Sequence, residues 1–311
     1  MKNSLSPKRF LWVLGVAGFL LGALFLALCW LSSSRLICPP RRALQDYHRE
    51  ILLASGQHAM RVESFLTGGV PCLMCEPLGG QENSLKGRKI REQLTEKGVL
   101  LSPWGDVRAT LVLLHGHTGR KEDHLPGHGD HPEPFASFGV TESALPEAVL
   151  HEAAQRFEFS PAPCGLFGIS QGGAIALQSA ARPGAAWFAV AELSAFASLD
   201  EVIRAQAQRL FGPSHPLAQD VVRSLVRIRA GYDPRAVRPV DAVGRIACPV
   251  LIGHGDDDRF VPPDHAQRLF RAVAPGVKKQ FLDIPDAGHH NILITEAPVY
   301  ATIASFFLAA L

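Results

Sequence analysis

The chain has 311 residues, enough for one large domain with extensions, and 47% of them are apolar, which is ample for a buried core. The formal net charge is only +2, and the sequence holds no basic block and no basic stripe with interleaved aromatic residues. These features exclude nucleic acid as an expected partner.

Residues 10–31, FLWVLGVAGFLLGALFLALCWL, form an apolar segment without any charge. A helix rises about 1.5 Å per residue and crosses a hydrocarbon core of about 30 Å with about 20 residues, so this segment predicts a single transmembrane anchor. A cleaved signal peptide is the alternative, but the apolar core of such a peptide is typically only about 7–15 residues long. Basic residues flank both sides almost equally, and the short tail of residues 1–9 favours an extracytoplasmic domain.

Residues 32–59 are expected to form a juxtamembrane linker with one helix, and the main domain to cover residues 60–311. Residues 60–77 alternate apolar and polar around two glycines, which is typical of a β-hairpin. Cys72 and Cys75 have redox or zinc spacing, but residues three apart in a strand face opposite sides. We expect both cysteines to pack as small hydrophobic side chains.

Beyond the hairpin, apolar strand-like runs alternate with helix-like segments. No element is assigned to the polar residues 79–98. Strands are expected at 109–116, 162–169, 185–193, 247–255 and 278–285, and helices at 141–157, 172–182, 200–211, 218–230, 263–274 and 295–311. The alternation predicts the α/β class, with a mainly parallel, doubly wound sheet covered by helices on both faces.

Residues 165–177, GLFGISQGGAIAL, place Ser170 between an apolar strand and an apolar helix. GISQG fits the pattern G-x-S-x-G, a sharp strand-to-helix turn that strains the serine and leaves room only for glycine at Gly168 and Gly172. The turn lifts the hydroxyl above the sheet edge, at a helix N-terminus that favours negative charge. The alternative is a serine N-cap in an ordinary glycine-rich turn, but the strand before and the helix after are what the motif requires.

A serine becomes a good nucleophile only when a base removes its proton. After the last strand, DAGHHNIL offers His289 and His290, and HGDDDRFVP offers Asp256, Asp257 and Asp258. The order serine, acid, histidine is that of α/β-hydrolases. On these motifs the chain resembles the α/β-hydrolase superfamily, in particular its esterase, lipase and serine-aminopeptidase-like groups.

The resemblance covers roughly residues 60–311 and implies roles for three residues. Ser170 would be the nucleophile, and Asp258, in the family pattern HGxxDxxVP, would be the acid that orients the base. His289, in a partly kept GxGH ending, would be the base. Asp256 and Asp257 remain alternatives for the acid, and His290 is expected to be only a neighbour of the base.

LLHGHTG, residues 113–119, resembles the oxyanion loop of the superfamily. The backbone N–H groups of Gln171 and His117 would form the oxyanion hole, while His115 would orient the loop. Five histidines fall within 17 residues here, but they lack the spacing of a metal-hydrolase motif. We therefore expect no catalytic metal, and we expect no organic cofactor because the sequence holds neither a GxGxxG turn after its first strand nor a phosphate loop. The histidines are His115, His117, His124, His128 and His131.

In one respect the chain departs from the superfamily. There the HGxxG loop leads into a helix, a further strand and a glycine-rich turn, whereas here HGHTGRKEDHLP runs directly into GHGDHPEPFASFG, with the joint at Leu125-Pro126. The chain thus lacks that helix and strand. We expect either that the hairpin pairs directly with the strand at 109–116, or that the domain is damaged by exposed apolar surface and unpaired backbone groups.

Residues of about 199–245 fall where the superfamily inserts a cap over the active site, and Phe211, Leu217 and Val221 either line an acyl pocket or pack on the core. The resemblance implies a membrane-anchored serine hydrolase whose substrate is a small acyl compound. It would cleave a carboxylic ester, a thioester or a small amide through an acyl-enzyme. The alternatives are an aminopeptidase-like member of the superfamily and a catalytically silent, membrane-tethered domain.

Overall fold

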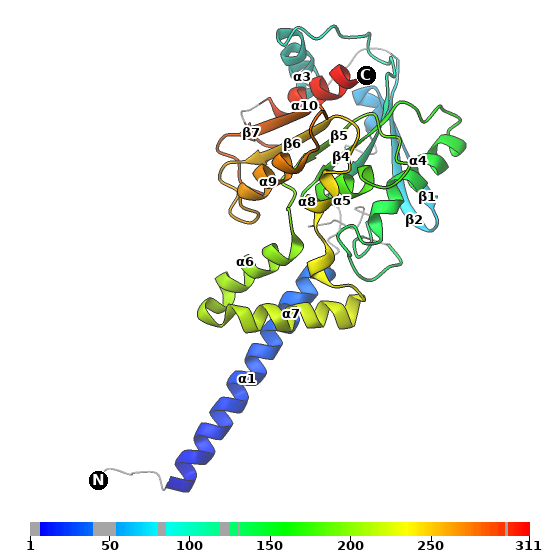
Figure 1. The fold of residues 1–311 in the computed structure, drawn as a ribbon. Coiled ribbons are helices and arrows are strands. Elements are labelled where there is room, and N and C mark those ends of the chain that lie inside the picture. The colour runs from blue at the N-terminus through cyan, green and yellow to red at the C-terminus, as the bar shows by residue number, and fades with distance from the viewer. Residues whose placement is uncertain (1–6, 40–53, 80–84, 118–124, 130, 296–297) are drawn as a thin grey trace.

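The computed structural model of the chain describes residues 7–39, 54–79, 85–117, 125–129, 131–295 and 298–311. The helix predicted in the juxtamembrane linker falls mainly on residues 40–53, outside the described residues. Within the described part, the strands form a two-stranded sheet and a five-stranded sheet (Figure 1).

The larger sheet has the strand order β3-β4-β5-β6-β7, and every neighbouring pair is parallel. One buried cluster on one face joins the sheet to α5 and α9, and a second cluster on the other face joins it to α10. The predicted parallel sheet with helices on both faces is therefore confirmed. The strands are β3 (Thr110–Leu114), β4 (Cys164–Ile169), β5 (Val190–Leu193), β6 (Val250–Gly255) and β7 (Lys279–Ile284).

The helices between the strands lie close to their predicted positions. They are α4 (Leu145–Arg156), α5 (Gln171–Ala180), α6 (Leu199–Phe211), α7 (His215–Ala230) and α9 (Asp264–Ala272), and the predicted last helix is α10 (Val299–Ala310). The short α8 (Pro239–Val243) was not predicted, and short 3-10 turns lie at Ser55–His58, Glu142–Ala144, Gly212–Ser214 and Pro234–Ala236. Since α6 and α7 leave the sheet after β5 and return before β6, they form a cap at the carboxyl ends of the strands, on one side of the domain (Figure 1).

Two elements differ from the prediction. The polar stretch 79–98 contains a helix, α3 (Leu85–Glu96), which the sequence hides because only Leu94 in it is buried. This helix packs against α10, and the Lys86 ammonium lies 3.8 Å from the centre of the Tyr300 ring. Strand β5 is also shorter than predicted, because a turn after α5 still occupies residues 182–185.

The predicted hairpin is confirmed as β1 (Met60–Thr67) and β2 (Val70–Pro77), which pair around two glycines of positive φ. The expectation that it pairs with the edge strand of the large sheet is wrong, because β1 and β2 form a sheet of their own. The hairpin packs on α4 instead, where the Phe65 and Phe157 rings meet edge to face at 5.5 Å.

Strand β3 is an edge strand of the described sheet. Among the described residues between β3 and β4, only helical elements occur, so the strand that the superfamily places beside β3 is not replaced there. Leu113 on β3 is 67% exposed, as expected for an edge that has lost its covering layer.

The N-terminal helix α1 (Pro7–Ile37) continues past residue 31, where the apolar segment ends. Among the described residues it is the helix long and apolar enough to cross a membrane, a test that a signal sequence also passes. Its first part projects away from the domain (Figure 1), whereas Cys29, Ser33 and Ile37 near its end are fully buried. The end of α1 is thus part of the folded domain.

The cap packs against α1. The rings of Phe211 on α6 and Phe25 on α1 meet edge to face at 5.3 Å. Val221 is partly buried against the core, while Leu217 is exposed. Of the two roles left open for these residues, the structure places Phe211 and Val221 in packing contacts.

Candidate active site

Ser170 occupies a strained turn between β4 and α5. Its φ is 54° and its ψ is −115°, a combination that a residue with a Cβ atom rarely adopts. The backbone N–H of Ser170 donates to the carbonyl oxygen of Leu193 on β5 at 2.7 Å, which ties the turn to the sheet. The serine hydroxyl therefore stands at the carboxyl edge of the sheet, at the N-terminus of α5.

The turn leaves no room for side chains on its two flanking glycines. A Cβ atom on Gly168 would lie 2.2 Å from the carbonyl oxygen of Gly172, and a Cβ atom on Gly172 would lie 2.2 Å from the carbonyl oxygen of Leu114. In both cases the obstacle is backbone, which cannot rotate away as a side chain can. The tightness of the turn thus depends on both glycines.

The structure brings Ser170, His289 and Asp258 together from the loops after β4, β7 and β6. Ser170 Oγ lies 2.9 Å from His289 Nε2, and His289 Nδ1 lies 2.6 Å from Asp258 Oδ2. The other candidates lie outside this chain of contacts: Asp256 and Asp257 are exposed, as is His290, whose ring meets the His289 ring edge to face at 5.5 Å.

Asp258 is buried and held by several donors. Its Oδ1 accepts hydrogen bonds from the backbone N–H groups of Phe260 at 2.9 Å and Val261 at 2.8 Å. Burial alone would raise the pKa of Asp258, but hydrogen bonds from His254 and His289 outweigh it and hold the pKa well below its usual range. The ionised carboxylate keeps the proton of His289 on Nδ1, so that Nε2 is free to accept the proton of Ser170.

Behind the triad lies a second pair of buried groups. His254 Nε2 lies 3.3 Å from Asp258 Oδ2 and donates to the carbonyl oxygen of Val261 at 2.8 Å. Burial would lower the pKa of His254, but its contacts with Asp258, Val261 and Glu192 raise it. Glu192 on β5 is fully buried, accepts a hydrogen bond from the Ala195 N–H at 2.7 Å, and burial raises its pKa to about 7.

The two expected oxyanion donors lie next to each other. Gln171 is the first residue of α5, where a backbone N–H has no acceptor within the helix. The ring of His117 contacts the side-chain amide of Gln171 at 2.9 Å through Nδ1, and its Nε2–H donates to the carbonyl oxygen of Arg35 at 2.9 Å. Burial lowers the pKa of His117, so its ring is neutral. The donor role of the two backbone N–H groups stays a prediction.

The contact with Arg35 is the feature that sequence reasoning missed. It joins residues 82 positions apart, and no motif around Arg35 announces it. The sequence also gave His128 no role, although its Nε2 lies 3.0 Å from the carbonyl oxygen of His117 and burial lowers its pKa to about 3. The G-H-G turn around His128 was the available signal.

Three of the clustered histidines order the loop after β3. His115 Nδ1–H donates to the carbonyl oxygen of Gly116 at 2.8 Å, and its Nε2 accepts from the N–H of Leu125 at 3.0 Å. The His128 ring packs edge to face on those of His115 and His117, at 4.9 and 5.6 Å. His124 lies outside the described residues, within which no group of histidine, cysteine and acidic side chains is arranged to hold a metal ion.

Aromatic side chains surround the site. Phe138 stacks on the His117 ring at 5.2 Å, and Phe196 meets Phe138 at 6.0 Å. Phe260 is partly exposed, and its ring lies 5.0 Å from that of His289. Aromatic rings therefore flank both the loop after β3 and the imidazole of His289.

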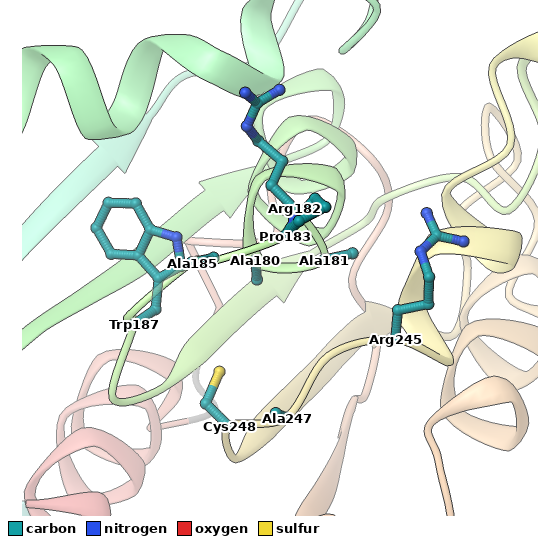
Figure 2. Close-up of a pocket in the computed structure, with 10 residues that line it drawn as sticks. Ala180, Ala181, Arg182, Pro183, Ala185, Trp187, Arg245, Ala247 and Cys248 are labelled. Carbon is teal, nitrogen blue, oxygen red and sulfur yellow. The ribbon is translucent and has the colours of Figure 1, made fainter.

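A hollow of about 480 Å³ lies away from this site (Figure 2). It is lined by residues that follow α5 and precede β5 and β6, among them Arg182, Trp187, Arg245 and Cys248. These segments lie at the amino ends of the strands, opposite to the edge that carries Ser170. The hollow thus takes no part in the triad.

Comparison with known proteins identifies the family of the chain. The model of the prolyl oligopeptidase family matches residues 147–311, more than half of the chain, and this range includes Ser170, Asp258 and His289. No curated protein sequence matches the chain.

Among solved structures, the chain is similar to an esterase from Pyrococcus furiosus, with 14% identity and a TM-score of 0.58 over 88% of this chain and 97% of the esterase. It is also similar to a puromycin hydrolase, with 18% identity and a TM-score of 0.54, over 81% of this chain but only 39% of that larger protein. At these identities the likeness concerns the fold, which is that of an α/β-hydrolase. The chain belongs to the prolyl oligopeptidase family and is a serine hydrolase.

The tight turn gives a first prediction. In G172A the new Cβ would meet the carbonyl oxygen of Leu114 at 2.2 Å, so the turn must open and displace Ser170. We expect labelling of the protein by a fluorophosphonate probe to fall about 100-fold, the usual effect of a displacement of about 1 Å. G56A is the matched control, because a Cβ atom there meets nothing within 4 Å. Normal labelling of G172A would contradict the steric requirement.

Glu192 gives a second prediction. Its pKa of about 7 in the folded state exceeds the value of about 4.3 expected when unfolded, so its contribution to stability is complete at low pH and is lost as the pH rises through 7. In the wild type we expect the unfolding free energy to fall by on the order of 3 kcal/mol between pH 5 and pH 8, because Glu192 contributes less at the higher pH. In E192Q we expect this fall to be absent. Urea unfolding of the detergent-solubilised protein at both pH values measures it, with the exposed Glu147→Gln as control. An unchanged pH dependence in E192Q would show the prediction to be wrong.

Proposed function

We propose that this protein is a membrane-anchored serine hydrolase that cleaves a carboxylic ester, with Ser170 as nucleophile, His289 as base and Asp258 as the orienting acid. The observation that carries the proposal is the continuous chain of contacts, 2.9 Å from Ser170 to His289 and 2.6 Å from His289 to Asp258. Each contact has the donor and acceptor that the reaction requires.

The reaction would proceed in two halves. Ser170 Oγ attacks the ester carbonyl carbon while its proton passes to His289 Nε2, and the oxyanion forms beside the Gln171 N–H at the N-terminus of α5. His289 then gives this proton to the leaving alcohol, and an acyl-Ser170 ester remains. A water molecule that loses its proton to the same nitrogen hydrolyses the acyl-enzyme and restores Ser170.

A peptidase is the second candidate, and the name of the matching family favours it. A peptidase acting at an N-terminal residue needs carboxylates that bind the free amine. Among the acidic residues near the triad, Glu192 on β5 is fully buried, Asp257 pairs with Arg259 at 3.0 Å, and Asp256 is exposed to solvent. The partly exposed Phe260 beside His289 fits an acyl chain better than an ammonium group with no facing carboxylate.

The buried end of α1 supports an uncleaved anchor. The guanidinium of Arg229 lies 4.1 Å from the centre of the Trp30 ring and donates to the hydroxyls of Ser33 at 2.9 Å and Ser34 at 2.8 Å. Removal of the helix would leave this cation and the apolar groups around Cys29 facing water. These contacts support a single-pass anchor, and the short tail of residues 1–9 is our reason to place the catalytic domain on the extracytoplasmic side.

The triad is tested by fluorophosphonate labelling of single variants. We expect S170A to lose labelling completely, and D258N to lose about 10⁴-fold in ester hydrolysis because His289 would adopt the wrong tautomer. D257N and H290N are matched controls, since both residues are exposed neighbours of the triad, and should keep full activity. Folded wild-type protein that fails to label would instead identify a catalytically silent domain.

The anchor is tested on the protein isolated from membranes. We expect its intact mass to include the whole of α1, and carbonate at high pH to leave it in the membrane fraction, since a transmembrane helix resists such extraction. A mature chain that begins after residue 31 would identify a signal peptide and overturn the anchor.

A further inference from the structure

The position of the membrane along α1 follows from its two exposed tryptophans. Trp12 and Trp30 lie near the two ends of the apolar segment, and they are 18 positions apart, which corresponds to about 27 Å of helix. Tryptophan is enriched at both boundaries of a membrane, and about 30 Å is the thickness of its hydrocarbon core. The cap already packs on the helix at Phe25, Cys29 is buried, and beyond Trp30 the helix enters the domain, where Ser33 and Ile37 are fully buried. The lipid surface therefore meets the domain at the level of Trp30.

The catalytic edge of the sheet lies just above this level. Arg35 is five residues beyond Trp30, a rise of about 7.5 Å along the helix. Its carbonyl oxygen accepts the hydrogen bond from His117, whose ring contacts Gln171, the residue after the nucleophile. Two residues further, the carbonyl oxygen of Ile37 accepts from the N–H of Ala136 at 2.9 Å. The end of α1 is thus bonded to the loops of the site itself.

The cap lies at the same level. Arg229 near the end of α7 covers the Trp30 ring at 4.1 Å, and α7 lies across α1 on the side of the domain from which the free part of α1 projects (Figure 1). Leu217 and Ile228 lie on one stripe of α7 and are 60% and 79% exposed. Leu210 at the end of α6 is exposed as well. We name these three residues the interfacial face.

The interfacial face has the composition of a helix surface that lies in a lipid interface. Its exposed apolar side chains are bordered by the exposed Arg209 and Arg227, and such a pairing of basic and apolar residues binds the headgroup and acyl boundary. The face is continuous with α1, so the same bilayer that holds α1 would cover it. A bilayer is therefore its occupant, rather than a second protein.

We propose that the interfacial face rests in the bilayer and that the site takes its substrate from there, an amphiphile whose acyl chain lies in the membrane and whose ester lies at headgroup level. The inference rests on the proposed function, because it names the substrate class of the same triad. Phe260, partly exposed beside His289, is placed to contact the acyl chain next to the reacting ester.

The route of the substrate is tested with the full chain reconstituted in phosphatidylcholine vesicles. A fluorogenic long-chain acyl ester that does not exchange between vesicles is placed either in the same vesicles or in separate ones. We expect hydrolysis in the same vesicles to be at least about tenfold faster, because the substrate is confined with the enzyme. Equal rates would mean that the substrate arrives through water and would overturn the inference.

The interfacial face is tested with L217S/I228S in the same vesicles. We expect hydrolysis of the vesicle-bound ester to fall about fivefold, because apolar contact with the bilayer is lost. Labelling by the fluorophosphonate and hydrolysis of water-soluble p-nitrophenyl acetate should stay unchanged. The matched control L85S/L100S alters two residues that are 79% and 97% exposed, on α3 and shortly after it, and α3 lies far from the cap (Figure 1). An equal loss in the control, or no loss in L217S/I228S, would overturn the role of this face.

These outcomes are distinct from failure of the proposed function. If the fluorophosphonate does not label the wild-type protein and the protein hydrolyses neither ester, the triad proposal fails. Contact of the interfacial face with the bilayer is then measured separately, as the quenching by brominated lipid of the fluorescence that I228W adds to that of the wild type. Quenching would support the interfacial placement, and its absence would refute it.

Discussion

The strained backbone of Ser170 is the constraint on which the site depends. With φ at 54° and ψ at −115°, the residue persists in this state only because its surroundings leave no alternative. The N–H bond to Leu193 fixes the turn from the side of β5, and the contact of Gly172 with the carbonyl of Leu114 fixes it from the side of β3. The neighbouring parallel strands β3, β4 and β5 therefore hold the hydroxyl toward His289, so the accuracy of the site comes from this part of the sheet.

Local sequence patterns predicted most of the fold, whereas contacts between residues far apart in the sequence could not be predicted from them. The strand-turn-helix around Ser170 is visible because its residues are adjacent in the chain. The three aspartates after β6 look alike in sequence, and what distinguishes Asp258 is the pair of backbone donors at Phe260 and Val261, which only the folded loop presents. Helix α3 was missed because it buries a single leucine, too little for a periodic pattern. The Arg35–His117 bond joins segments whose approach depends on how α1 docks.

The position of β3 at the edge of the sheet explains how the triad tolerates the missing helix and strand. Ser170, Asp258 and His289 follow β4, β6 and β7, so none of them adjoins the lost neighbour of β3. The loop after β3 is the part of the site that loses its support. In this chain that loop is held by His115, by His128 and by the end of α1, through contacts of 2.8 to 3.0 Å. The missing helix and strand therefore leave their mark on the exposed edge strand β3, where Leu113 is not covered.

Helix α1 consequently serves the domain in two ways that cannot be separated. Its apolar length suits a bilayer, while its last turns bury Ile37 in the core and offer the Arg35 carbonyl to His117. The His117 ring is half-buried, and its hydrogen bond to Arg35 holds it beside the side chain of Gln171. Any force that tilts or withdraws α1 must therefore act on the loop beside Gln171. The way in which α1 docks on the domain then helps to set the geometry of the site.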